Sequence, residues 1–118
     1  MRTGSTSLEL KKLIADLRSL STKEKVKLWR RLADDLSKAS RQRREVNLYT
    51  IEETTNLGEI AVVPGKVLSE GELGKKLTVA AYKFSDKARE KISKVGKAIT
   101  IRELMKENPK GKKVRILG

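Results

Sequence analysis

The stretch 77–84 constrains the fold more than any other part of this chain. It reads Leu-Thr-Val-Ala-Ala-Tyr-Lys-Phe, so apolar side chains occupy both alternating sets of positions of an extended chain. A strand that is apolar on both sides is usually covered on both of its faces. This segment therefore predicts a buried central strand, which the rest of the chain has to cover.

The segments around this strand alternate between strand and helix patterns. Further strands are predicted at 46–48, 60–63, 66–68, 98–99 and 114–117. Pro64-Gly65 is expected to halt the strand at 60–63. Ser85 is placed to cap a helix ending at Gly96, and a capping box at 100–103 opens a helix that Asn108 ends. Strands that alternate with short helices predict an α/β fold.

The first third of the chain has the periodicity of two amphipathic helices. Ser7 can cap the first helix, whose apolar stripe consists of Leu10, Leu13, Ile14 and Leu17. A capping box at 21–24 is expected to open the second helix, which runs to about Ser37 with a stripe of Leu28, Trp29, Leu32, Ala33 and Leu36. Because the link between the helices is short, we expect a hairpin with the two stripes facing each other.

Basic residues are concentrated in particular segments. The chain has 28 Lys and Arg against 15 Asp and Glu, a net charge of +13. Three arginines fall within 41–44 and four basic residues within 110–115, whereas 46–65 contains none. So positive and uneven a charge indicates a polyanionic partner, whose binding should also relieve the self-repulsion of the folded chain.

Several classes of function are disfavoured. Without Cys or His the chain has no disulfides, no thiolate metal site and no histidine general base, so neither enzymatic activity nor a cofactor or small-molecule substrate is expected. No apolar run approaches the ~20 residues of a membrane helix. Residues 1–7 lack the apolar core of a secretory signal. We expect a soluble intracellular protein.

Five blocks of sequence carry a resemblance to a known family. In order they are Arg-Gln-Arg-Arg-Glu-Val-Asn-Leu at 41–48, Val-Val-Pro-Gly-Lys-Val-Leu at 62–68, Leu-Thr-Val-Ala-Ala-Tyr-Lys-Phe-Ser at 77–85, Val-Gly-Lys-Ala-Ile at 95–99 and Asn-Pro-Lys-Gly at 108–111. The chain resembles the archaeal and eukaryotic large-subunit ribosomal protein eighteen family, relatives of bacterial large-subunit protein fifteen. The resemblance implies an irregular superhelix of strand-strand-helix turns after an N-terminal helical region. It also implies binding to large-subunit ribosomal RNA, among neighbouring ribosomal proteins, in the cytoplasmic ribosome.

The length of the chain suits one domain, 1–118, with a basic helical region and connector at 1–45 and an α/β core at 46–118. Lys and Arg neutralise phosphates, and Arg can direct two hydrogen bonds at one phosphate. RNA contact is expected from Lys11, Lys12, Arg30, Arg31, Lys38, Arg41, Arg43, Arg44, Lys66, Lys75, Lys76, Lys110, Lys112 and Lys113. The alternative for each is an ordinary solvated charge.

The four aromatic residues, Trp29, Tyr49, Tyr82 and Phe84, are expected in the core. No aromatic platform would then remain for stacking unpaired bases, which is how single-stranded RNA is commonly read. The sequence therefore favours recognition of folded RNA by its shape and backbone.

Two other functions remain open from the residues alone. The N-terminal helices could form the helix-turn-helix of a DNA-binding regulator, although their link lacks the glycine often found in such turns. Glu52, Glu53 and Glu59 could hold Mg²⁺ in an enzyme that cleaves or modifies RNA. Their other interpretation places two of them in the first turn of a helix at 50–55, on a face directed away from RNA towards solvent or a basic protein.

Overall fold

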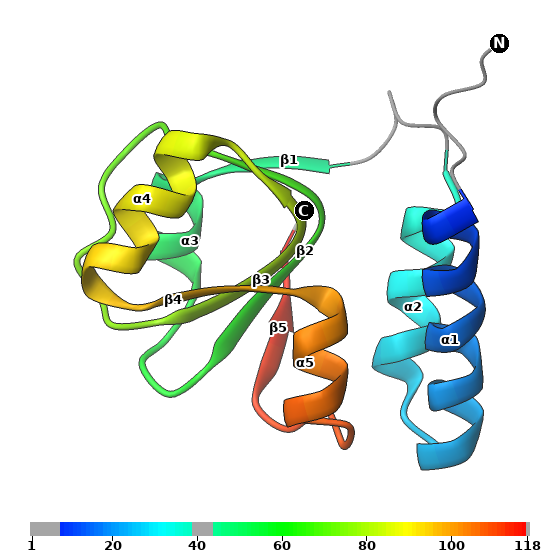
Figure 1. The fold of residues 1–118 in the computed structure, drawn as a ribbon. Coiled ribbons are helices and arrows are strands. Elements are labelled where there is room, and N and C mark those ends of the chain that lie inside the picture. Colours follow the sequence, from blue (N-terminus) through cyan, green and yellow to red (C-terminus); the bar gives the residue numbers. More distant parts are fainter. Residues whose placement is uncertain (1–7, 39–43, 118) are drawn as a thin grey trace, which may run out of the picture.

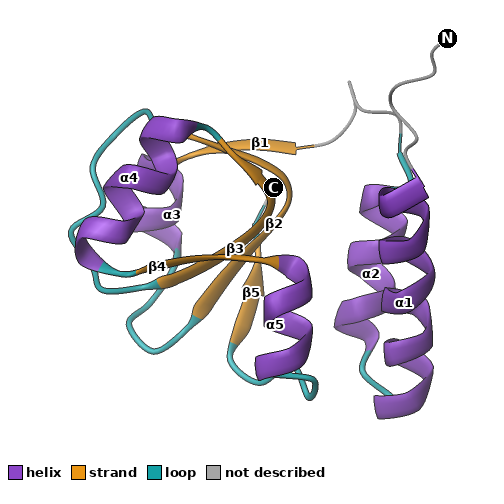
Figure 2. Cartoon of the chain, in the orientation of Figure 1, coloured by secondary structure: helices purple, strands orange, loops and turns teal. Residues whose placement is uncertain are grey.

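The computed structural model describes residues 8–38 and 44–117, without the side chain of Arg44. A central sheet lies between two layers of helices (Figures 1 and 2). The elements are α1 (Leu8–Glu24), α2 (Lys27–Leu36), β1 (Arg44–Asn47), α3 (Leu48–Thr54), β2 (Ile60–Leu68), β3 (Thr78–Phe84), α4 (Asp86–Val95), β4 (Lys97–Thr100), α5 (Ile101–Glu107) and β5 (Val114–Ile116). The predicted α/β class, with a helical hairpin ahead of a strand-helix core, is confirmed. None of the described helices has the length and apolar character needed to cross a bilayer.

All strand pairs in the sheet are parallel, in the order β1-β2-β3-β4, with β5 also paired to β2. Strand β2 pairs with β3 along one side. Its other side is divided, because β5 pairs with Ile60–Val62 and β1 with Gly65–Leu68. Strand β2 therefore has neighbours on both sides over most of its length. Its side chains enter the cores on both faces of the sheet, so it is almost entirely buried.

The prediction that Pro64-Gly65 halts a strand is wrong. Strand β2 continues through both residues, which are buried. Its register with β3 shifts here, from Val63 opposite Ala81 to Lys66 opposite Lys83, so β2 contains one extra residue. A bulge is one of the few sites in a sheet that tolerates proline, since the extra residue need not donate to the ladder. Lys66 consequently lies in a strand rather than in a turn.

The predicted central strand is confirmed as β3, with cover on both faces. Val79 and Ala81 belong to a core that includes α3 and α4. Ala80 belongs to a second core, formed with α1, α2 and α5. The alternation of small and branched apolar residues in β3 thus joins the two helical layers.

The hairpin of α1 and α2 is confirmed, but its turn was predicted wrongly. Helix α1 continues to Glu24, so Ser21 is not an N-cap. Its hydroxyl instead donates to the carbonyl oxygen of Val26 at 2.7 Å, across a turn in which Lys25 has a φ of 59°. Only Lys25 and Val26 separate the helices. Both apolar stripes also pack on the sheet, because residues of each helix share a core with β2 and β3.

The predicted N-caps of α4 and α5 are confirmed. The Ser85 side chain accepts a hydrogen bond from the Ala88 backbone N–H, and Thr100 and Glu103 form both bonds of a capping box. Gly96 ends α4 with an extended φ of −149°, so no left-handed conformation requires glycine. The reason is a close approach, since a Cβ at Gly96 would collide with the Leu77 carbonyl oxygen.

The strand and the helix predicted around Glu52 and Glu53 begin earlier in the chain than expected. Strand β1 and helix α3 each begin two residues earlier than expected, so no acidic residue lies in the first turn of α3. Glu52 accepts hydrogen bonds at Oε1 from the backbone N–H groups of Gly74 and Lys75, at 2.9 and 3.1 Å. This carboxylate binds the loop before β3 and does not stabilise the N-terminus of α3.

Candidate nucleic-acid interface

The turn between α5 and β5 presents three exposed lysines, Lys110, Lys112 and Lys113, on a fixed backbone. The Asn108 side chain accepts from the Lys112 N–H at 3.2 Å and donates to the Lys112 carbonyl at 2.8 Å. Gly111 has a φ of 66° and donates from its N–H to the Asn108 carbonyl at 2.9 Å. Asparagine closes such turns because its side chain can bond to nearby backbone. The lysines are therefore carried by an ordered loop.

This loop is docked on the end of the helical hairpin. Trp29, fully buried in α2, donates from Nε1 to the Pro109 carbonyl at 2.8 Å. Lys110 Nζ lies 2.8 Å from Glu24 Oε1. Gly111 faces Leu28 so closely that a Cβ at this position would lie 2.8 Å from Leu28 Cδ2. Segments 80 residues apart thus form one unit.

The result is a surface that we call the basic tip, made of Lys23, Lys25, Lys27, Lys110, Lys112 and Lys113. All six side chains are exposed, and the α1–α2 link and the α5–β5 loop lie at the same end of the molecule (Figure 1). Glu24 offsets part of this charge, since its side-chain hydrogen bond with Lys110 lowers the pKa of its carboxyl. The lysines at 23, 25 and 27 were missed by sequence reasoning, although their alternate spacing around a helix junction was visible.

The connector lies mostly outside the described residues, which include neither Arg41 nor Arg43. The backbone of Arg44 opens β1 opposite Gly65. Lys38 is exposed and lies 3.3 Å from Asp35 Oδ1. RNA contact by these four residues stays a prediction.

The three remaining core lysines differ in their surroundings. Lys66 is exposed in β2, between Glu45 of β1 and Lys83 of β3. Lys75 is half-buried, and its Nζ donates to the carbonyls of Glu52 at 2.7 Å and Thr55 at 3.0 Å. These carbonyls lie at the end of α3, where a cation is favourable. Lys76 is exposed. The structure does not bring these lysines to the basic tip.

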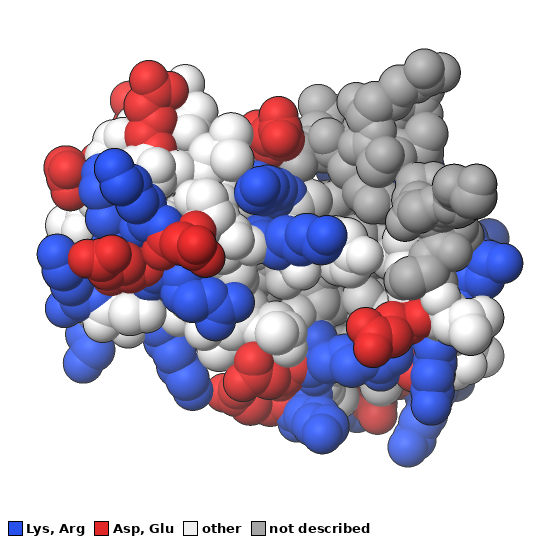
Figure 3. Space-filling model, turned by 45° about the horizontal axis from the view of Figure 1, so that its top comes forward, with Lys and Arg blue, Asp and Glu red and all other residues white. Residues whose placement is uncertain are grey.

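The helical basic residues Lys11, Lys12, Arg30 and Arg31 are exposed. Arg30 lines a groove along the hairpin that also contains Arg18, Lys25 and Lys27. On the face in Figure 3, basic side chains are spread over several elements with acidic ones between them. The charge on this face is therefore more mixed in space than along the sequence.

Three of the four aromatic residues agree with the core prediction. Trp29 is fully buried, and Tyr82 and Phe84 are half-buried. The Arg89 guanidinium lies 5.0 Å from the Phe84 ring centre, within cation–π range. The prediction is wrong for Tyr49, which lies in the first turn of α3 and is 47% exposed.

Two of the three residues proposed for Mg²⁺, Glu52 and Glu59, have other partners. Glu59 binds Arg115 with both oxygens, at 2.9 and 3.0 Å, and this hydrogen bond is the main cause of its lowered pKa. Glu52 holds the loop at Gly74 and Lys75. Within 8–38 and 44–117, no group of three potential ligands is placed to bind a metal ion.

The helical hairpin also differs from a DNA-reading helix-turn-helix. In that motif the helices meet at ~90–120°, whereas α1 and α2 run side by side (Figure 1). Helix α2 further uses Trp29, Leu32, Ala33 and Leu36 to pack within the protein core.

Comparison with known proteins identifies relatives over nearly the whole chain. Residues 9–100 match the family model that describes ribosomal proteins 50S-L15 and 50S-L18e together with the 60S ribosomal protein twenty-seven A. Large ribosomal subunit protein eL18 of Methanopyrus kandleri is 43% identical over 121 residues, covering 98% of this chain and 95% of the relative. The eL18 proteins of Sulfurisphaera tokodaii and Haloarcula marismortui are 44% and 42% identical, covering 98% and 97% of this chain and 96% and 98% of the relatives. The chain therefore belongs to the family of large-subunit ribosomal proteins that comprises 50S-L15, 50S-L18e and their 60S counterpart.

Proposed function

We propose that this chain is a structural constituent of the large ribosomal subunit in the cytoplasm, where it binds and stabilises folded large-subunit ribosomal RNA. Family membership supports the ribosomal role. The observation that carries RNA contact is the basic tip, in which two lysine-bearing turns far apart in sequence are held together by the Trp29–Pro109 hydrogen bond.

The chemistry of the basic tip suits an RNA backbone. Lysines act as point charges on phosphates, and a backbone fixed by Asn108 needs little further ordering when RNA binds. Described aromatic side chains are mostly buried or half-buried, which disfavours stacking on unpaired bases. Recognition then rests on the phosphates and the shape of a folded RNA.

Neighbouring ribosomal proteins are the second class of partner. The stretch 46–65, which contains no Lys or Arg, contributes α3 and the start of β2, with Glu53 exposed. Like charges repel, so this side should face away from RNA, towards solvent or a basic neighbouring protein.

Salt-dependent binding tests the proposal. Wild-type protein should bind in vitro transcribed large-subunit ribosomal RNA with an affinity that falls steeply with salt, because each neutralised phosphate releases counterions. The double variant Lys112→Gln/Lys113→Gln should lower the magnitude of the log-log slope by up to ~0.7–0.9 per lysine. The exposed pair Lys87→Gln/Lys94→Gln on α4 is the charge-matched control. If the slope of Lys112→Gln/Lys113→Gln equals those of the control and the wild type, the basic tip is not part of the interface. Preference for duplex DNA at matched salt would overturn the RNA assignment.

The connector is tested separately. Arg43→Ala and Arg44→Ala should each lower the slope by up to about one. An unchanged slope in their double variant would place the connector away from the RNA. Crosslinks mapped in purified particles should connect these residues and the basic tip to RNA of the large subunit.

A further inference from the structure

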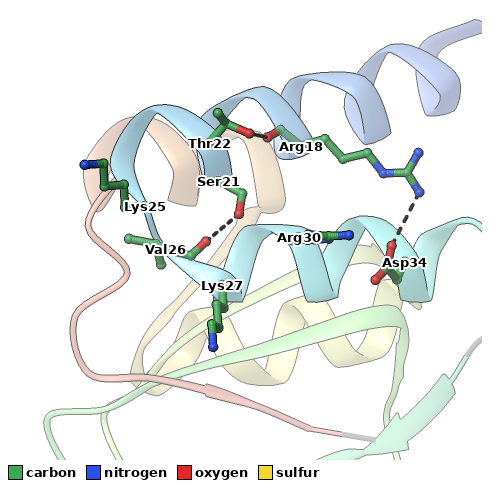
Figure 4. A pocket seen from close by; sticks show the side chains of 8 residues that line it. All are labelled: Arg18, Ser21, Thr22, Lys25, Val26, Lys27, Arg30 and Asp34. Atoms are coloured by element: carbon green, nitrogen blue, oxygen red, sulfur yellow. Dashed lines mark hydrogen bonds and ion pairs between the residues drawn. The ribbon is translucent and has the colours of Figure 1, made fainter.

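An open groove of about 690 Å³ runs along the outer side of the helical hairpin, between α1 and α2 (Figure 4). Its lining consists of Arg18, Ser21, Thr22, Lys25, Val26, Lys27, Arg30 and Asp34. The α1 residues come from its last two turns and the α2 residues from one helical stripe, so the groove begins at the hairpin turn. Lys25 and Lys27 belong both to this groove and to the basic tip.

Cationic residues outnumber acidic ones along this groove, although Lys25 and Lys27 direct their ammonium groups outward at its hairpin end (Figure 4). Among its described lining residues there are four cations and one carboxylate, Asp34. The two hydroxyls are already used, since Ser21 donates to the Val26 carbonyl at 2.7 Å and Thr22 to the Arg18 carbonyl at 3.2 Å. The α2 end adds no competing anion, because no acidic residue lies in its first turn. The groove therefore recognises a ligand chiefly through cationic groups.

We propose that the groove binds successive phosphates of an RNA strand that continues from the basic tip along the hairpin. This inference rests on the proposed function and extends it to Arg18, Lys25 and Lys27, of which Lys25 and Lys27 were not predicted from the sequence. Arginine can direct two hydrogen bonds at one phosphate, and the groove has two arginines. Val26, the one apolar residue among the described lining, offers little anchorage for the side chains of an acidic peptide.

Asp34 sets the strength of this site. Arg18 Nη2 lies 3.4 Å from Asp34 Oδ1 and 3.3 Å from Ser37 Oγ, and both side chains of the ion pair are more than half exposed. Such long, solvated contacts hold a guanidinium weakly, so an arriving phosphate can take over Arg18. The same carboxylate repels phosphate. Removing its charge should therefore strengthen RNA binding, in contrast to removing a cation.

The test measures binding to in vitro transcribed large-subunit ribosomal RNA in a salt series. Lys27→Gln/Arg30→Gln should weaken binding by about five- to tenfold per lost phosphate contact at 0.1 M salt, and lower the slope. Asp34→Asn should tighten it by about two- to fivefold, because like charge is removed beside the strand. The control Lys87→Gln/Lys94→Gln should bind as wild type, and circular dichroism should verify that all variants fold.

Acylation of lysines gives a readout at the site itself. Bound RNA should protect Lys25 and Lys27 from an amine-reactive ester and leave Lys94 on α4 reactive. Suppose that wild-type affinity for RNA falls steeply with salt, that both groove variants have the same affinity and slope, and that Lys27 stays reactive. The groove inference is then overturned and the proposed function stands. If the wild type shows no salt-dependent binding, the proposed function itself fails. More effective competition by poly-glutamate than by RNA of equal charge would assign the groove to an acidic peptide instead.

Discussion

The Trp29 side chain offers the sharpest test of how this fold forms the basic tip. It is completely buried among the helices and donates to the Pro109 carbonyl, so it packs the hairpin and holds the α5–β5 turn at once. Trp29→Ala removes a whole indole from a site that cannot fully collapse, which should lower the free energy of unfolding by roughly 3–5 kcal/mol. The lost hydrogen bond places the expected value in the upper part of this range.

Trp29→Phe separates packing from hydrogen bonding. Phenylalanine keeps most of the buried ring surface but leaves the Pro109 carbonyl without its donor, so it should cost about 1–3 kcal/mol. Because the carbonyl lies in the turn that carries Lys110 and Lys112, this variant should also weaken salt-dependent RNA binding. Tyr49→Ala, which removes an exposed aromatic ring, should cost less than about 1 kcal/mol.

Urea unfolding followed by far-ultraviolet circular dichroism provides the measurement. Trp29 is the only tryptophan of the chain, so its fluorescence cannot report on these variants. Equal m-values are needed for a comparison of free energies. A loss below about 1 kcal/mol for Trp29→Ala would refute the burial argument. Wild-type stability in Trp29→Phe would show that the hydrogen bond contributes nothing to the fold.

Three further outcomes follow from other sites. In urea unfolding, Gly96→Ala should destabilise by ~1–3 kcal/mol, because its Cβ would meet a backbone carbonyl. Gly74→Ala, where the Cβ has open space, should be nearly neutral in the same experiment. Thr55→Val should raise the unfolding free energy by about 1 kcal/mol, since the Thr55 hydroxyl is buried and has no described hydrogen-bond partner; a loss of stability would mean that the hydroxyl is satisfied. The hydrogen bond with Arg115 lowers the pKa of Glu59, so the contribution of this pair to folding stability is complete above the ordinary glutamate pKa and disappears as pH falls through the lowered value. The stability difference between wild type and Glu59→Gln should therefore shrink with acidification. A pH-independent difference would contradict the role of the Glu59–Arg115 pair.

Local patterns predicted the elements well where one short-range effect determines them. The Thr100 capping box and the Ser85 cap involve atoms three residues apart, and both form as expected. The central strand was recognisable because both of its faces are apolar. At Ser21 two local outcomes competed: the residues fit a capping box, but the hydroxyl bonds forward to Val26 and α1 continues.

The features that sequence could not predict depend on contacts across the chain. Pro64 resembles a strand breaker, yet a bulge accommodates it because β2 receives a different partner on each side of this point. Likewise, Lys75 has the sequence context of an ordinary exposed turn lysine. In the structure its ammonium donates to carbonyls at the end of α3, which come from a distant part of the sequence. The basic tip arises from a contact over 80 residues, which no local periodicity encodes.

The divided edge of β2 has a consequence for the order in which a growing chain can complete this sheet. Residues 44–47 precede β2 and can pair with its second half as soon as both have been synthesised. Its first half, Ile60–Val62, has to wait for Val114–Ile116, more than fifty residues later. Until then, an apolar strand edge stays open to other chains, which is a known route to aggregation. A nascent chain that has stalled before residue 114 should therefore depend on chaperones far more than the completed protein does.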